Sequence, residues 1–308
     1  MVDILMAVYN GEKFVAEQID SILAQSETYW HLIICDDMSK DRSFEIISGY
    51  AQKYPDKISA HKNAVPTGSA QANFMSMLQY AQSEYVMFSD QDDFWEKDKV
   101  KLTLAKMKEL EAKNGNIPLL VHTELAIADG ELNITHSRFT VFQGLDPKAN
   151  TLNRLAAQNN VTGCTAMMNR PLLELVKGID PKNMLMHDWW FAMAAAAFGK
   201  IGFVDTPTIR YRQHGNNQLG AVNNRSLAGA AKIVSQRMKT KKRVSITYTQ
   251  AKNFLDTYRD ILPDEARKCL EIYTDIPNHN KLGRIYLLIK HGFLKQNFLT
   301  AAGQLVFC

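Results

Sequence analysis

YVMFSDQDDFW, residues 85–95, is a short apolar run followed at once by three carboxylates in four positions. Asp90, Asp92 and Asp93 repel one another, and aspartate is a poor strand former. One interpretation is a solvated turn, in which aspartate is common. The other is a site for a hard cation such as Mg²⁺ or Mn²⁺, which prefers carboxylate oxygens and leaves room for a substrate phosphate.

Apolar runs and helical patterns alternate on both sides of this stretch. Before it, the apolar runs at 3–10, 31–37 and 57–63 are each followed by a segment with apolar residues at helical spacing. After it come a helical pattern at 96–113 and another apolar run at 119–129. This alternation, with fully apolar strands, predicts an α/β fold whose mostly parallel sheet is covered by helices on both faces.

Polar side chains follow three of the predicted strands. Tyr9 and Asn10 end the first strand, Asp36 and Asp37 end the second, and the acidic group at 90–93 ends the fourth. Because ligands of such sheets bind outside the carboxyl ends of the strands, these side chains are predicted to share one edge. A solvated turn would have to recur three times at that edge, so the cation site is the preferred interpretation.

Other acidic or phosphate-binding motifs do not fit. An EF-hand loop starting at Asp90 needs glycine at its sixth position and glutamate at its twelfth, where this chain has Trp95 and Lys101. Neither a G-x-x-x-x-G-K-[ST] loop nor a G-x-G-x-x-G fingerprint is present. Nucleotide hydrolases and Rossmann dehydrogenases are therefore disfavoured.

The composition is that of an ordinary globular protein. The chain has 308 residues, of which 46% are hydrophobic and 22% charged. Its four cysteines form no C-x-x-C pair, which favours a reducing compartment. The first residues, MVDILMAVYNGE, lack a basic region and are predicted to form a strand rather than a signal peptide. No stretch of about eighteen uncharged apolar residues is present, so no membrane span is expected.

The net charge of +4 is unevenly distributed. Residues 206–255 contain ten lysines and arginines and no acid, and residues 276–308 again contain no acid. A basic C-terminal third indicates an anionic neighbour, such as phospholipid headgroups or a phosphorylated substrate, or else a plain solvated face. Nucleic acid is not expected as a partner, because no zinc-finger spacing or RNA-binding aromatic signature accompanies the charge.

Five motifs, taken in order, resemble the family 2 glycosyltransferases, which have the GT-A fold. Three are ILMAVYNGEKFVAEQIDSILAQ at 4–25, LIICDDMSKD at 32–41 and FSDQDDFWEKDKV at 88–100. The other two, TGCTAMMNRPL at 162–172 and HDWWFAMAAAAFGKIGFVDTPTIRYRQHGNN at 187–217, resemble the branch that includes bacterial rhamnosyltransferases of cell-surface polysaccharides. The resemblance implies a catalytic domain at 1–220, followed by a basic, mainly helical extension at 221–308.

The resemblance also implies where the donor binds. Asp90–Gln91–Asp92 corresponds to the DxD motif, in which Asp92 binds Mg²⁺ or Mn²⁺ and Asp90 faces the sugar or ribose. Asp93 either supports the motif or caps the next helix. The residues that follow the first two strands, Tyr9, Asn10 and either Asp36 or Asp37, are expected to bind the base and ribose. Gly68 and Asn73 are also expected to lie beside the donor.

The acceptor side follows from the later motifs. Asp188 corresponds to the general base of an inverting transfer, although aspartate there is also a favoured helix cap. Trp189 stacks on a sugar or packs in the core, and Arg212 binds phosphate or meets water. His214 is either a further metal ligand or a structural histidine.

The expected reaction moves L-rhamnose from dTDP-L-rhamnose, or a hexose from a UDP-sugar, to a glycan or lipid-linked glycan. Residues 283–307 fit an amphipathic helix on anionic lipid, or a helix docked on the protein body, so we expect a cytoplasmic protein at the inner face of the cell membrane. Two alternatives remain. A sugar-nucleotide nucleotidyl or phosphoryl transferase normally needs a glycine-rich N-terminal loop, where this chain has AVYNGE, and an inactive glycan-binding homologue is expected to lose Asp92 or Asp188.

Overall fold

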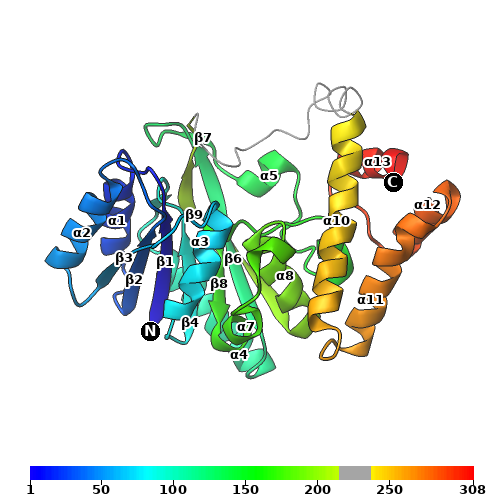
Figure 1. Cartoon of the computed structure of the whole chain (residues 1–308), viewed down its shortest axis with the longest axis horizontal. Coiled ribbons are helices and arrows are strands. Elements are labelled where there is room, and N and C mark those ends of the chain that lie inside the picture. Colours follow the sequence, from blue (N-terminus) through cyan, green and yellow to red (C-terminus); the bar gives the residue numbers. More distant parts are fainter. Residues whose placement is uncertain (215–236) are drawn as a thin grey trace.

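The computed structural model describes residues 1–214 and 237–308, without the side chains of 237–243. Within these residues the chain forms one mixed sheet in the order β3-β2-β1-β4-β8-β6-β9-β5, with β7 paired to β6 (Figure 1). The strands are β1 (Val2–Val8), β2 (Trp30–Asp36), β3 (Ile58–Lys62), β4 (Tyr85–Ser89), β5 (Phe94–Trp95), β6 (Leu119–Ala128), β7 (Ile134–His136), β8 (Met167–Asn169) and β9 (Lys200–Arg212).

The predicted α/β fold with a mostly parallel sheet is confirmed. Strands β1 to β4 are parallel to one another, and β6 is parallel to β9. The antiparallel strand β8 stands between β4 and β6, so the carboxyl ends of β4 and β6 point the same way. The short strands β5 and β7 are also antiparallel to their neighbours.

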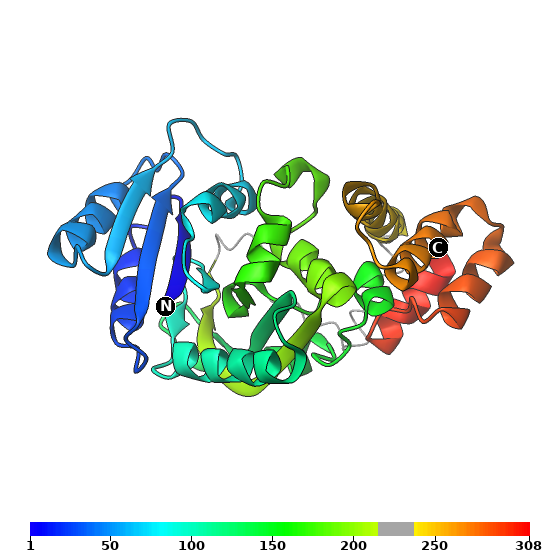
Figure 2. The same cartoon turned by 90° about the horizontal axis from the view of Figure 1, so that it is seen from below.

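Helices cover both faces of the sheet (Figure 2). The helices are α1 (Val15–Leu23), α2 (Ser43–Lys53), α3 (Ala70–Met77), α4 (Lys99–Asn114), α5 (Phe139–Gln143), α6 (Leu152–Ala157), α7 (Arg170–Val176), α8 (His187–Phe198), α10 (Arg237–Tyr258), α11 (Asp264–Asp275), α12 (Lys281–Lys290) and α13 (Phe298–Phe307). Each of the nine predicted segments from 3–10 to 119–129 contains the expected helix or strand.

Two hydrophobic cores result from the alternation of side chains along the strands. In β1, Ile4 and Met6 join a first core, which contains α1. Leu5 joins a second core, which contains α3 and α8. The buried residues of α1 include Ile19 and Ile22, three positions apart, which places them on one face of the helix. The apolar strands are therefore buried on both faces, as their sequence predicts.

The helices α10 to α13 extend the second core rather than forming a separate one. The ring of Trp190 in α8 lies 5.0 Å from that of Phe254 in α10, and Tyr273 of α11 is fully buried in the same core. The expected boundary at residue 220 lies outside the described residues, so the division into two domains stays a prediction. The predicted helix at 283–307 is instead two helices, interrupted at Gly292, whose φ is +68°.

Among the described residues, none of the helices has both the length and the apolar composition that a bilayer crossing requires.

Candidate active site

The carboxyl ends of β1, β2, β4, β6 and β9 lie at one edge of the sheet. The register pairs Val8 with Asp36 at the ends of β1 and β2, and Ala128 with Arg212 at the ends of β6 and β9. The structure therefore brings together the residues that follow these strands, as the sequence analysis expects. This edge is called the acidic edge below, after the aspartates at 36, 37, 90, 92 and 93.

Gln91 joins the loop after β4 to the end of β1. Its side-chain oxygen accepts from the backbone N–H of Tyr9 at 2.8 Å, and its Nε2 donates to the Tyr9 carbonyl at 3.0 Å. A Cβ at position 11 would overlap the Gln91 amide, so a side chain there would displace the amide from this pairing. Gln91 thus holds Asp90 and Asp92, its neighbours in the chain, in a fixed position relative to the end of β1. The ring of Tyr9 itself remains exposed.

Asp92 and His214 form the most direct contact across the acidic edge. The Nε2 of His214 lies 2.8 Å from Oδ2 of Asp92, and the His214 ring stacks on Phe14 at 4.9 Å. Neighbouring ligands of an octahedral cation, each about 2.1 Å from the metal, lie about 3 Å apart. The spacing and the oxygen–nitrogen donor set therefore fit a shared Mn²⁺ or Mg²⁺.

Asp188 is held by three hydrogen bonds. Its Oδ1 accepts from the Trp189 backbone at 2.6 Å and from Nδ2 of Asn159 at 3.2 Å, and its Oδ2 accepts from the Gly163 backbone at 3.0 Å. Burial nevertheless raises the pKa of Asp188 to about 6. Helix α8 begins after Met186, so Asp188 lies in its first turn rather than at the capping position.

Asp90 connects the two groups electrostatically. Burial, the charge of Asp92 and the charge of Asp188, in that order, raise the pKa of Asp90 to about 7. The segment at 163–164 links these acids in space, because the ligand atoms of Cys164, Asp90 and Asp93 lie within 4.8 Å of one another and the adjacent Gly163 donates to Asp188 at 3.0 Å. The acids after β4 and the acid at the start of α8 therefore border a single site.

Asp36 and Asp37 differ in how many of their carboxylate oxygens accept hydrogen bonds. Asp37 accepts from the Thr67 backbone at 2.7 Å, from the Thr67 hydroxyl at 2.8 Å and from Nδ2 of Asn63 at 2.8 Å, so both its oxygens are used. Asp36 uses Oδ1 for the Ser39 backbone at 3.1 Å, and its buried Oδ2 has no hydrogen-bond partner among the described residues. Asp36 is therefore the one with an unpaired oxygen, and that oxygen is buried at the end of β2.

The loops between β1, β2 and α3 are held by side-chain hydrogen bonds. Asn10 has a φ of +49°, and its side chain accepts from the Lys40 backbone at 2.9 Å. Asn73 is buried and donates to the Cys35 carbonyl at 3.0 Å. Gly68, with a φ of +87°, stands in open space, which suits a turn close to a ligand.

Arg212 is committed to protein contacts. Its Nε donates to the Asp92 carbonyl at 2.9 Å, and its Nη atoms reach the Gly130 carbonyl and the Glu17 carboxylate. The guanidinium also lies 4.7 Å from the Phe14 ring centroid. This buried side chain ties β9, the loop after β4 and α1 together.

Helix α8 places the residues next to Asp188 in apolar surroundings. Trp189 donates from its indole to the Leu155 carbonyl at 2.6 Å, and it packs against the second core. The His187 ring lies 4.8 Å from that of Phe74, and neither of its nitrogens has a hydrogen-bond partner in the described part of the chain. Burial lowers the pKa of His187 to about 4, so this ring is neutral at physiological pH.

Four residues of the site carry no individual role in the sequence analysis. Asn159 holds Asp188, and Cys164 lies in a group with Asp90 and Asp93 whose ligand atoms are all within 4.8 Å. Burial, together with the nearby acids, raises the pKa of Tyr211. The ammonium of Lys99 is buried 4.7 Å from the Trp95 ring, and burial lowers its pKa to about 8. The sequence signal was their adjacency to recognised motifs, which did not specify where each side chain points.

Asp93 does not cap helix α4, which begins after Asp98. Its side chain is fully buried, one oxygen accepts from the Arg212 backbone at 3.3 Å, and its pKa is raised by burial and by Asp90. The capping alternative is therefore wrong. Asp93 instead links the loop after β4 to the end of β9.

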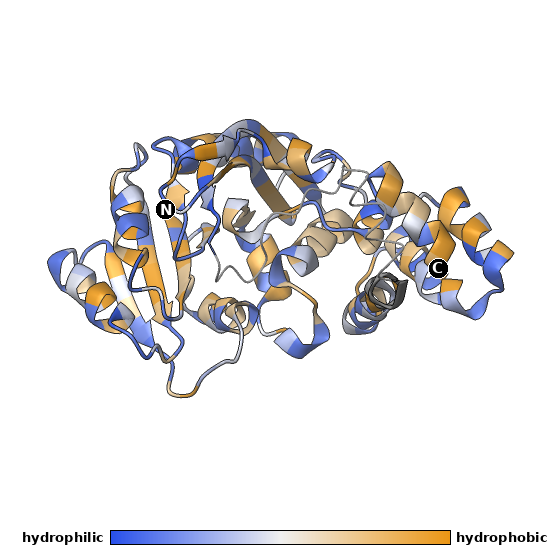
Figure 3. Ribbon diagram, turned by 90° about the horizontal axis from the view of Figure 1, so that it is seen from above, coloured by the Kyte–Doolittle hydropathy of each residue, from blue (hydrophilic) through white to orange (hydrophobic). Residues whose placement is uncertain are grey.

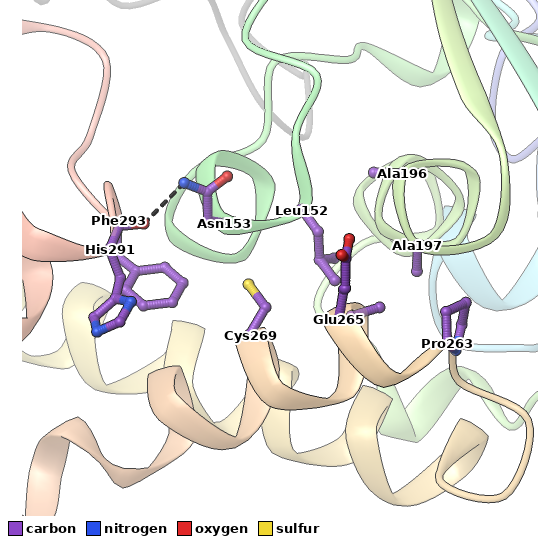
Figure 4. Close-up of a pocket in the computed structure, with 10 residues that line it drawn as sticks. Leu152, Asn153, Ala196, Ala197, Pro263, Glu265, Cys269, His291 and Phe293 are labelled. Atoms are coloured by element: carbon purple, nitrogen blue, oxygen red, sulfur yellow. Dashed lines mark hydrogen bonds between the residues drawn. The ribbon is translucent and has the colours of Figure 1, made fainter.

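A cavity of about 360 Å³ lies away from the acidic edge. It stands between α6, the end of α8 and α11, and Figure 4 shows Cys269, Glu265 and His291 around it. Nδ2 of Asn153 donates to the His291 carbonyl at 2.9 Å on one side of the cavity. None of the predicted site residues lines it.

Comparisons with known proteins place the chain in a family. The sequence model of the family described as glycosyl transferase family 2 matches residues 3–175. The dTDP-rhamnosyl transferase RfbG of Shigella flexneri is 31% identical over 235 residues, which cover 70% of this chain and 74% of that protein.

A second relative and a solved structure are also similar to this chain. The UDP-Glc:alpha-D-GlcNAc-diphosphoundecaprenol beta-1,3-glucosyltransferase WfgD of Escherichia coli is 26% identical over 56% of this chain and 62% of that protein. The solved structure of the mannosyltransferase PcManGT from Pyrobaculum calidifontis, in complex with GDP-Man and Mn²⁺, has a TM-score of 0.54 at 17% identity. It covers 94% of this chain and 72% of that one.

Proposed function

The chain belongs to glycosyl transferase family 2 and has the GT-A fold, and we propose that it transfers L-rhamnose from dTDP-L-rhamnose to a glycan hydroxyl, with inversion and with the help of a divalent metal. The observation that carries the proposal is the segment at 163–164, which lies between the two groups of acids: the ligand atoms of Cys164, Asp90 and Asp93 are within 4.8 Å of one another, and the Gly163 backbone donates to Asp188 at 3.0 Å. On this proposal Asp90 lies on the donor side and Asp188 on the acceptor side.

Asp188 acts as the general base. As the acceptor hydroxyl oxygen attacks the anomeric carbon, its proton passes to the Asp188 carboxylate, and the bond from that carbon to the diphosphate oxygen breaks on the opposite face. A base with a pKa of about 6 is ionised at neutral pH and still basic enough to take the proton. The hydrogen bonds from Gly163 and Trp189 fix its direction.

The donor's diphosphate is proposed to lie beside Asp92 and His214. These two residues would hold the Mg²⁺ or Mn²⁺ ion, which as a Lewis acid would offset the charge that develops on the leaving nucleoside diphosphate. The support is the 2.8 Å contact between an oxygen and a nitrogen that both suit such an ion. Asp90 would then accept from a hydroxyl of the sugar or ribose.

The nucleoside is proposed to lie over the ends of β1 and β2. Tyr9 offers an exposed ring for stacking, and Asp36 offers an unused carboxylate oxygen to a base N–H or a ribose hydroxyl. Rhamnose as the sugar is supported by the similarity to a dTDP-rhamnosyl transferase along 70% of the chain. UDP-linked hexoses are the next donors to test.

A lipid-linked glycan is the proposed acceptor, and the inner face of the cell membrane the proposed location. The support is the name of the WfgD relative, which specifies a diphosphoundecaprenol-linked acceptor, and the basic C-terminal helices. Trp189, which is half-buried, is proposed to contact the acceptor sugar.

A donor panel tests the function. The purified chain is incubated with dTDP-L-rhamnose, UDP-glucose, UDP-GlcNAc and GDP-mannose, each with and without Mn²⁺. We expect slow, metal-dependent release of dTDP from dTDP-L-rhamnose and little release from the others. Release of pyrophosphate from a separate mixture of dTTP and rhamnose 1-phosphate would instead favour a nucleotidyl transferase, and the absence of any release in either assay would favour an inactive glycan-binding protein.

A further inference from the structure

Helix α12 exposes an apolar stripe. Leu282, Tyr286 and Ile289 are 79%, 58% and 55% exposed, and their spacing of four and three residues puts them on one face of the helix. Leu288, by contrast, is fully buried in the second core. One side of α12 therefore anchors it to the protein while the other presents large apolar side chains to the surroundings. These three residues are called the α12 stripe below.

Lysines flank the α12 stripe. Lys281 and Lys290 are both exposed, at the two ends of the helix, and Nζ of Lys290 lies 5.3 Å from the ring centroid of Tyr286. The nearest acid before the helix, Asp275, is paired with His279 at 2.8 Å, and no acid follows it in the sequence. An apolar stripe between cations is complementary to a surface that is anionic outside and apolar beneath.

Helix α13 continues this surface. Nζ of Lys281 donates to the Val306 carbonyl, so the end of α13 lies beside the start of α12. Val306 is 59% exposed, and Phe298, the first residue of α13, is 83% exposed. Figure 3 shows both C-terminal helices largely in the hydrophobic colour, at the end of the molecule farthest from α2.

We propose that the α12 stripe, flanked by Lys281 and Lys290, docks the protein on an anionic phospholipid bilayer. The lysines contact the headgroup phosphates, and Leu282, Tyr286 and Ile289 enter the boundary between headgroups and acyl chains. The inference deepens the proposed function, because it rests on a lipid-linked acceptor. A bilayer is favoured over a second copy of the chain because two copies of this face would bring lysines of like charge together.

The position of the helices agrees with this role. In Figure 1, α12 and α13 lie in the upper half of the molecule, toward which the carboxyl ends of the central strands also point. The docking surface and the acidic edge are thus both carried by this half of the molecule.

Vesicle co-sedimentation tests the proposal with the full chain. The vesicles are phosphatidylcholine alone or phosphatidylcholine with phosphatidylglycerol. We expect binding only to the anionic vesicles, and weaker binding at high salt because surface charges are screened. The triple variant Leu282→Ser, Tyr286→Ser, Ile289→Ser should bind at least about tenfold more weakly. The charge variant Lys281→Gln, Lys290→Gln should lose the preference for phosphatidylglycerol.

Ile261→Ser is the matched control, because Ile261 is 60% exposed in the turn between α10 and α11. It should bind vesicles as the unaltered chain does. Unchanged vesicle binding by the triple variant, with an unchanged unfolding transition, would overturn the proposal. A dimer that the triple variant dissociates would also overturn it, by identifying a second copy as the occupant. If vesicles bind but no donor releases its nucleotide, the proposed function fails while the docking surface stands.

Discussion

The Nε2 atom of His214 lies 2.8 Å from Oδ2 of Asp92, although 122 residues separate the two in the chain. The contact joins the end of β9 to the loop after β4, and Arg212 reinforces it by donating to the Asp92 carbonyl. Two parts of the chain thus meet where a cation and a diphosphate are proposed to bind. Each part can be tested by its own substitution.

Removing one side of this contact should weaken metal binding. We expect His214→Ala to raise the Mn²⁺ concentration needed for half-maximal activity by about 10- to 100-fold, with a smaller change at saturating Mn²⁺. His31→Ala is the control, since His31 lies near the start of β2 at the opposite edge of the sheet. Activity that persists in EDTA, or an unchanged Mn²⁺ requirement in His214→Ala, would contradict the metal assignment.

The pH profile should show an ascending limb from Asp188. Burial raises the pKa of this acid to about 6. A general base works when deprotonated, so kcat/KM should rise by about tenfold per pH unit below this value and level off above it. Initial rates measured at saturating Mn²⁺ give the profile. A rate that falls as the pH increases through 6 would mean that a protonated group is required instead.

Asp36 and Asp37 should respond differently to the same change. Asp36→Asn alters an acceptor with a free oxygen, and we expect KM for the donor to rise by about tenfold with the unfolding free energy little changed. Asp37→Asn replaces an acceptor of three hydrogen bonds, and should lower the unfolding free energy by about 1–3 kcal/mol. Denaturant titration and donor kinetics measure both. A reversal of the two effects would exchange their roles.

Gly11 and Gln91 should be coupled. A methyl group at position 11 overlaps the Gln91 side chain, so Gly11→Ala should cost about 1–3 kcal/mol of unfolding free energy and raise the donor KM. In Gly11→Ala, Gln91→Ala the overlap is gone, and the pair should be less destabilised than the sum of the single changes, by about 0.5–3 kcal/mol. Additive effects would show that the pairing of the Gln91 amide with Tyr9 does not hold the loop after β4 in position.

Local patterns predict most of the fold. The strands at the centre are apolar runs whose length fits a buried strand, and the helices between them carry apolar residues at helical spacing. The three-residue strand β8 is too short for such a pattern, and its antiparallel place between β4 and β6 depends on long-range pairing. The break at Gly292 depends on one residue with positive φ, where the sequence shows only continued apolar clusters.

The sequence predicts which residues gather at the site, but it predicts few of the contacts that these residues make. Strand order alone brings Tyr9, Asp36 and Asp92 to one edge. One partner of Arg212, however, is Glu17, 195 residues away, and no local pattern encodes that pairing. Which oxygen of Asp36 or Asp37 remains free is likewise decided by the Thr67 loop, which carries no recognisable motif.

The decisive measurement is the turnover of Asp188→Asn, compared with that of Asp180→Asn, which alters an exposed aspartate in the loop between α7 and α8. Metal-dependent release of nucleoside diphosphate and donor binding are measured on the same preparations. We expect Asp188→Asn to lower turnover by roughly 10²- to 10⁴-fold and to leave donor binding nearly intact, and Asp180→Asn to change neither. Turnover by Asp188→Asn equal to that of the unaltered chain would contradict the general-base role of Asp188.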